Sequence, residues 1–188
     1  MTLRRVGELL DKVDAWNVQL RQTYADPYDP QASEAASALA DYVVVRAYAE
    51  FELHINLLLA LRCEHSQDRP LGCFVRNRER LETSPEALFE KRKSGRIAYG
   101  DLTATLAGFG ANCKSNLDAH LKGLGLDPRV VEADWGKVTR ARHSIAHYRG
   151  YSGLTLSEVR KAVASCCSLV EAYGQALGVP QAIMADLD

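Results

Sequence analysis

The chain has 188 residues, of which 47% are hydrophobic and 25% are charged, with a formal net charge of -1 at pH 7. This length fits one globular domain with a sizeable core. The balanced charge excludes a protein that is basic over its whole surface, so any anion-attracting surface must be local. The longest apolar stretch, 43–61, is interrupted by Arg46, Glu50, Glu52 and His54, which excludes a membrane-spanning helix there.

Two helices are predicted in the first third of the chain. Apolar residues recur at helical spacing from Leu3 to Leu20, and the two prolines within 26–30 then break the helix. The stretch from Ser33 to Cys63 is rich in alanine and leucine, and it predicts one long helix at the centre of a bundle. Its buried side is expected to consist of Leu39, Val43, Ala47, Phe51, Ile55, Leu58 and Leu59.

The middle of the chain predicts four short helices. They are 71–81, a helix that starts at the Ser84-Pro85-Glu86 signal, 102–109 with Asp101 as its capping residue, and 116–124. Glycines follow the last two of these helices, as is usual where a helix ends.

Two longer helices are predicted to close the chain. Asp127-Pro128 predicts the start of a helix that runs to the glycines at 150 and 153. Ser157, followed by Glu158, predicts the start of a last helix that ends at Leu177, before a glycine and a proline.

The helical patterns together predict the fold class. No run alternates convincingly with a period of two, so little or no sheet is expected. We predict an all-α, single-domain helical bundle with about four core helices, extra short helices and an N-terminal helix. Residues 1–32 are assigned to the N-terminal helix and linker, 33–178 to the main helical domain and 179–188 to a short tail.

The stretch 137–149, Lys-Val-Thr-Arg-Ala-Arg-His-Ser-Ile-Ala-His-Tyr-Arg, carries the candidate site. Four basic residues and two histidines fall within it, without a carboxylate. Its apolar residues Val138, Ala141 and Ile145 recur at helical spacing, so we expect an amphipathic helix with one cationic side.

The cationic side has a defined geometry on a helix. At roughly 100° per residue, Arg140, His143 and His147 form one stripe, and Arg142 lies about 140° round from His147. A long arginine side chain can bend back toward that stripe. Cationic donors beside a titratable imidazole suit a phosphate group and the charge that grows on it during transfer.

The hexamer Arg142-His143-Ser144-Ile145-Ala146-His147 resembles the Arg-x4-6-His signature of the HEPN superfamily, small helical bundles that include many metal-independent ribonucleases. It is most similar to the RiboL-PSP-HEPN-like subgroup, which has Arg-x-x-Ile-Ala-His near the end of a mostly helical domain. Arg140 also fits the looser spacing, but Ala141 follows it where the family often has a polar residue. Arg142, followed by His143, is therefore the better match. The resemblance covers about residues 35–177.

The resemblance implies RNA cleavage through the neighbouring 2′-hydroxyl, with no cofactor. Arg142 would stabilise the phosphorane charge and His147 would transfer the proton, unless His147 is an inert, half-buried helical histidine. His143 would bond the phosphate or orient His147, unless it is only an exposed helix residue. The family joins two motifs across a two-fold cleft, so the resemblance also implies a homodimer.

Several residues are assigned supporting roles. By the resemblance, Glu50 or Glu52 would orient Arg142 through a carboxylate pair, although at least one of them is expected on a solvated helix face. Lys137 and Arg149 are expected to contact the RNA backbone. The family's toxin branch has a tyrosine two residues after its histidine, where this chain has Arg149. Tyr148 stands one place early and is expected to pack at the helix end.

Three functional hypotheses stay open at this point. The first is an endoribonuclease that acts as a toxin or defence effector, restrained by an antitoxin or another regulatory protein. The second is a HEPN-fold module that binds RNA or protein without cutting. The third is a bundle that binds a metal or small ligand through His143 and His147, whose i, i+4 spacing suits a helical metal site but lacks an obvious third ligand.

Two further observations bear on the chain's environment. The basic clusters 69–80 and 91–96 would guide an RNA backbone if they border the motif, and are otherwise solvated charge. The five cysteines lack paired Cys-x-x-Cys spacing, and no signal peptide is recognised. We therefore expect reduced thiols in a cytoplasmic protein, with the adjacent Cys166 and Cys167 in or near the core.

Overall fold

The computed structural model describes residues 4–65 and 97–180, apart from Ala25, Pro27, Ala111 and Arg149. Every regular element in these ranges is a helix: α1 (Arg4–Thr23), α2 (Pro30–His65), α5 (Tyr99–Phe109), α6 (Cys113–Gly123), α7 (Pro128–Tyr148) and α8 (Leu156–Ala176). The predicted all-α bundle is confirmed. The helices predicted at 71–81 and after Ser84-Pro85 lie outside the described residues, as does the tail beyond Pro180. None of the described helices is both long enough and apolar enough to cross a membrane.

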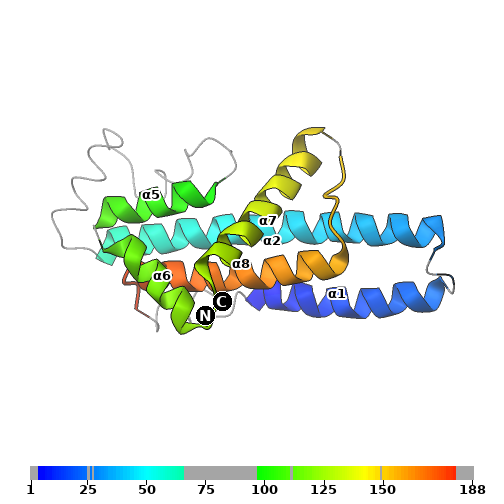
Figure 1. Cartoon of the computed structure of the whole chain (residues 1–188), viewed down its shortest axis with the longest axis horizontal. Coiled ribbons are helices and arrows are strands. Elements are labelled where there is room, and N and C mark those ends of the chain that lie inside the picture. Colours follow the sequence, from blue (N-terminus) through cyan, green and yellow to red (C-terminus); the bar gives the residue numbers. More distant parts are fainter. Residues whose placement is uncertain are drawn as a thin grey trace.

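The long helix α2 runs the length of the molecule (Figure 1). α1 lies antiparallel beside one half of α2, while α5 and α6 lie toward the other end. α8 contacts α1, α2, α6 and α7, so it lies inside the bundle. α7 crosses α2 obliquely, and its last turns stand clear of the other helices in this view.

One side of α2 supplies much of the core, as predicted. Leu39 is partly buried and the other six residues of the expected buried side are fully buried. Each fully buried aliphatic side chain contributes about 1.5–3 kcal/mol to the free energy of unfolding. α8 supplies the facing surface with a larger set of small and branched residues, which allows close packing against α1, α2, α6 and α7.

The start of α7 agrees with the sequence prediction. Pro128 is its first residue, and Asp127 Oδ1 accepts a hydrogen bond from the N–H of Arg129 at 2.9 Å. Proline at that position loses no helical hydrogen bond, and the aspartate satisfies an N–H that has no partner within the helix. These local signals fix where the helix that carries the motif begins.

Two short helices begin earlier than predicted. α5 begins at Tyr99, so Asp101 is not its capping residue but its third residue, where Oδ2 accepts the N–H of Ala98 at 2.8 Å. α6 begins at Cys113 because the N–H of Asn116 already donates to the carbonyl of Asn112 at 2.9 Å, which is a helical bond. Both helices therefore begin three residues before the predicted start.

The predicted start of α8 at Ser157 is wrong. Thr155 caps the helix: its Oγ1 accepts the N–H of Glu158 at 3.2 Å, and Glu158 Oε2 accepts the N–H of Thr155 at 2.9 Å. This reciprocal pair is a capping box, which needs the acid three residues after the cap. Glu158 stands at that distance from Thr155 but directly follows Ser157.

The adjacent thiols of α8 lie in the core, as expected. Cys166 is fully buried and Cys167 is partly buried against the core cluster. Burial raises the pKa of Cys166 well above its ordinary value, and it raises the pKa of Cys167 to about 12. Both thiols therefore stay protonated at neutral pH, and they act as small apolar side chains.

The capping assignment predicts different effects for two neighbouring substitutions. Thr155→Ala should lower the free energy of unfolding by about 1 kcal/mol, because the N–H of Glu158 loses its acceptor. Ser157→Ala, on the exposed first turn, should change it by less than about 0.5 kcal/mol. Urea denaturation of the two variants checks this, and a larger loss for Ser157→Ala would contradict the assignment.

Candidate functional site

The two ends of the motif stretch 137–149 have different surroundings on α7. Val138 and Ala141 are buried in the core, and Ile145 packs against it, as their spacing predicts. Beyond them the helix leaves the bundle, so Ala146 and His147 are exposed. The motif therefore starts on a rigid, buried helix and ends on an open surface.

Arg142 lies against one face of α2, which we call the Tyr48–Glu52 face after its two residues. The Arg142 Cζ lies 5.4 Å from the centre of the Tyr48 ring, within the range of a cation–π contact. Glu52 is one helical turn further along α2 on the same side. Burial raises the pKa of Glu52, and the positive charge of Arg142 opposes that rise. Arg142 is thus held near an aromatic ring and a half-buried carboxyl group.

The two glutamates singled out in the sequence lie on different sides of α2. Glu50 is buried toward α1, where its Oε1 lies 3.4 Å from Arg46 Nη2 and 3.9 Å from Arg5 Nη1. Residues two positions apart on a helix are separated by roughly 200° around its axis, so Glu50 and Glu52 face nearly opposite directions. Of the two, Glu52 is the acid near Arg142.

The two histidines of the motif lie together. The ring centres of His143 and His147 are 4.6 Å apart, with 49° between the ring planes. His147 is exposed and His143 is partly buried. Two imidazoles on an accessible surface are able to exchange protons with a bound substrate.

The other basic residues of the stretch differ in their surroundings. Lys137 Nζ lies 2.9 Å from Oδ1 of the buried Asp134, so its charge is paired within α7. Arg140 is exposed and folds back along α7, with Nη1 beside Gly136. The side chain of Tyr148 and the whole of Arg149 lie outside the described residues, as do the basic clusters 69–80 and 91–96.

The turn after α7 is fastened to α2. The N–H of Ser152 donates to Asp41 Oδ1 at 2.8 Å. Gly150 packs against the end of α7, where an added Cβ would lie 3.1 Å from Ser144 Oγ. These contacts limit the movement of the last turns of α7. Sequence analysis did not identify Asp41 or Tyr48, because neither belongs to a recognisable local motif.

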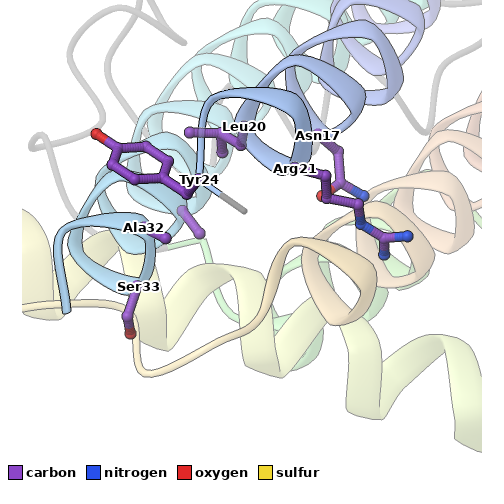
Figure 2. Close-up of a pocket in the computed structure, with 7 residues that line it drawn as sticks. Asn17, Leu20, Arg21, Tyr24, Ala32 and Ser33 are labelled. Atoms are coloured by element: carbon purple, nitrogen blue, oxygen red, sulfur yellow. The ribbon is translucent and has the colours of Figure 1, made fainter. Parts of the chain in front are cut away.

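Two surface hollows lie between α1 and α2, and neither is lined by residues of the motif stretch. One, of about 350 Å³, lies where α1 ends and α2 begins, and Figure 2 shows its lining: Asn17, Leu20, Arg21, Tyr24, Ala32, Ser33 and Ala36. The other, of about 340 Å³, lies beside Glu50 and Arg46. The motif therefore does not belong to either of these two hollows.

The described residues do not supply a metal cluster. No group of three or more His, Cys, Asp or Glu side chains within 4–65 and 97–180 is placed to hold a metal ion. A third ligand for a metal site at His143 and His147 is thus not found in the described part of the chain.

The described helices form an all-helical bundle, and α7 carries the arginine and two histidines of the motif stretch. The family model RiboL-PSP-HEPN matches residues 15–178, and the chain belongs to this family of the HEPN superfamily. The match begins within α1 and ends just after α8. Neither a curated protein nor a solved structure matches the chain.

The influence of the Arg142 charge on the pKa of Glu52 predicts a coupled titration. Arg142→Ala removes the positive charge that lowers the pKa of Glu52, so this pKa should rise further above its ordinary value of 4.5. The carboxyl carbon resonance of Glu52, assigned by its loss in Glu52→Gln, reports the titration. Arg129→Ala, at the other end of α7, is the matched control and should leave it unchanged.

The same shift predicts a pH-dependent stability. A carboxyl group whose pKa is raised by folding stabilises the fold below its unfolded value and loses that contribution as pH rises through the folded value. Relative to Glu52→Gln, the parent should therefore become less stable as pH rises from 4.5 through the folded-state pKa. A constant difference between the two proteins would contradict the raised pKa.

Proposed function

We propose that the chain is a HEPN-type endoribonuclease in which Arg142 and His147 act on the RNA backbone without a metal ion. The observation that carries this proposal is the location of Arg142. Its guanidinium is held on the Tyr48–Glu52 face, directly before an accessible pair of imidazoles in the chain. A fixed cation and accessible proton-transfer groups on one helix are the groups that phosphoryl transfer needs.

The proposed reaction uses a nucleophile within the substrate. A neutral imidazole removes the proton from the 2′-hydroxyl, and the 2′-oxygen attacks phosphorus. The guanidinium of Arg142 stabilises the added negative charge, and the bond from phosphorus to the 5′-oxygen breaks. An imidazolium protonates that 5′-oxygen. The products are a 2′,3′-cyclic phosphate and a free 5′-hydroxyl, so atoms and protons balance.

A homodimer is part of the proposal, because one histidine does not easily act as base and acid in the same step. The outer side of α2 supports it. Val45 and Leu53 are 39% and 46% exposed, which is high for large apolar residues, whereas Tyr42, 49% exposed, has its ring against Trp16 of α1. Val45 stands three residues before Tyr48 and borders the Tyr48–Glu52 face, and Leu53 follows Glu52 about 100° round the helix. Pairing through this side would bring two copies of the motif together.

The proposed biological role is that of a toxin or defence effector that an antitoxin or another regulatory protein restrains. Membership of the HEPN superfamily is the ground for this role. The negative charge of the RNA backbone would be complemented by Arg142 and the exposed Arg140. Lys137, at the start of the stretch, would contact the same backbone.

The first prediction of the proposal concerns cleavage in EDTA. The purified protein should cut RNA and leave 2′,3′-cyclic phosphate ends, and His147→Ala should lower the rate at least about 100-fold. Arg142→Ala should lower kcat more than it weakens RNA binding, because its charge acts mainly in the transition state. Gel assays with end analysis and a binding titration measure both effects.

Matched controls come from the same chain. His120→Ala on α6 and Arg129→Ala on α7 remove the same side chains away from the motif, and both should retain the parent rate. Cleavage that survives His147→Ala would point to a contaminating nuclease. A folded parent that cuts no RNA would count against the proposal and favour a module that binds without cutting.

The second prediction concerns the dimer. Leu53→Asp should weaken self-association at least about tenfold, roughly 1.4 kcal/mol, because a carboxylate would be buried in an apolar contact. Cleavage should fall in parallel. Val130→Asp changes an equally exposed residue at the start of α7 and is the control. Sedimentation velocity measures association, and a parent that is monomeric at micromolar concentration would exclude the composite site.

A further inference from the structure

Tyr48 is fixed at both ends of its side chain beneath Arg142. It is 1% exposed, and its ring packs against the indole of Trp135 with 6.1 Å between ring centres. Its hydroxyl oxygen accepts the N–H of Ile97 at 2.9 Å. A ring held in this way has little freedom to rotate or shift.

Ile97, which bonds to the Tyr48 hydroxyl, is also bonded to α7. Trp135 Nε1 donates to the carbonyl of Ile97 at 2.8 Å, so Ile97 bonds to α2 through its N–H and to α7 through its carbonyl. Trp135 is fully buried, and its ring centre lies 5.9 Å from that of Phe51. Tyr48, Ile97 and Trp135 therefore form a buried unit that joins α2, α7 and the start of α5.

We propose that Tyr48 is a positioning residue that holds the Arg142 guanidinium in place through its ring face. The inference rests on the proposed nuclease function, and it adds a residue of α2 that the motif does not contain. A cation–π contact does not use the guanidinium N–H groups as hydrogen-bond donors, so it leaves them available to a substrate phosphate. A carboxylate in the same place would instead accept hydrogen bonds from those N–H groups.

The physical reason is the flexibility of an arginine side chain. Arginine has many rotamers, and selecting one of them for catalysis has an entropic cost that lowers the rate. A buried aromatic face reduces this cost, because the guanidinium already occupies one position before the RNA binds. A nearby half-buried Glu52 supports the same position through its charge.

The closing experiment compares two substitutions of Tyr48 in the full chain. Tyr48→Leu removes the ring and should lower kcat about tenfold with KM within about twofold, as expected for a cation–π contact of this kind. Tyr48→Phe keeps the ring and loses only the hydroxyl bond to Ile97. It should therefore keep kcat within about threefold, although its melting temperature falls.

Two controls separate positioning from general damage to the core. Phe51→Leu removes another aromatic neighbour of Trp135 and should lower the melting temperature without the loss of kcat. In Arg142→Ala, adding Tyr48→Leu should change kcat by less than about twofold, because the group to be positioned is absent. Equal loss in Phe51→Leu, or in Tyr48→Phe, would overturn the inference.

A readout without activity tests the inference even if the chain does not cut RNA. The Nε–Hε resonance of Arg142, assigned by its loss in Arg142→Lys, should carry the ring-current shift of Tyr48. Tyr48→Phe should keep that shift and Tyr48→Leu should abolish it. An inactive parent with this pattern would reject the nuclease proposal but keep the positioning role. An unchanged resonance in Tyr48→Leu would overturn the positioning role in either case.

Discussion

The hydrogen bond from the Trp135 indole to the carbonyl of Ile97 fixes how α7 crosses α2. A fully buried indole needs an acceptor, because an unpaired N–H in the core costs about 1–3 kcal/mol. The chain before α5 supplies that acceptor, and Tyr48 holds the same residue from the other side. Arg142 stands two turns after Trp135 on nearly the same side of α7. The register set at Trp135 therefore carries Arg142 to the Tyr48–Glu52 face.

Several charges of this nearly neutral chain are neutralised by ion pairs among the described residues. Lys137 is paired with the buried Asp134, Arg46 and Arg5 with Glu50, and Arg160 with Asp14 of α1. Arg142 differs because its Cζ lies over the Tyr48 ring. The basic surface that is available to an anion is therefore smaller than the basic residues of the stretch 137–149 suggest. Lys137, for example, already neutralises Asp134 within the fold.

The features that were predictable from the sequence depend on neighbours along the chain. The start of α7 at Asp127-Pro128 and the buried side of α2 follow from caps and helical spacing. The start of α8 was wrongly predicted at Ser157 because two residues able to cap a helix, Thr155 and Ser157, stand within three positions. The contact of Tyr48 with Arg142, and the choice of Glu52 over Glu50, depend on where two distant helices cross. Local periodicity does not specify that crossing, so neither was predictable.

The separation of Tyr48 and Arg142 along the chain also sets when the candidate site assembles. α2 is made early, whereas α7 and the fastening contact of Ser152 with Asp41 come from the last part of the chain. Contacts between such distant segments form late, because bringing the two ends of a long stretch of chain together has an entropic cost. During synthesis, the half that carries Tyr48 leaves the ribosome without its partner. The two halves of the candidate site therefore come together only after α7 has been made.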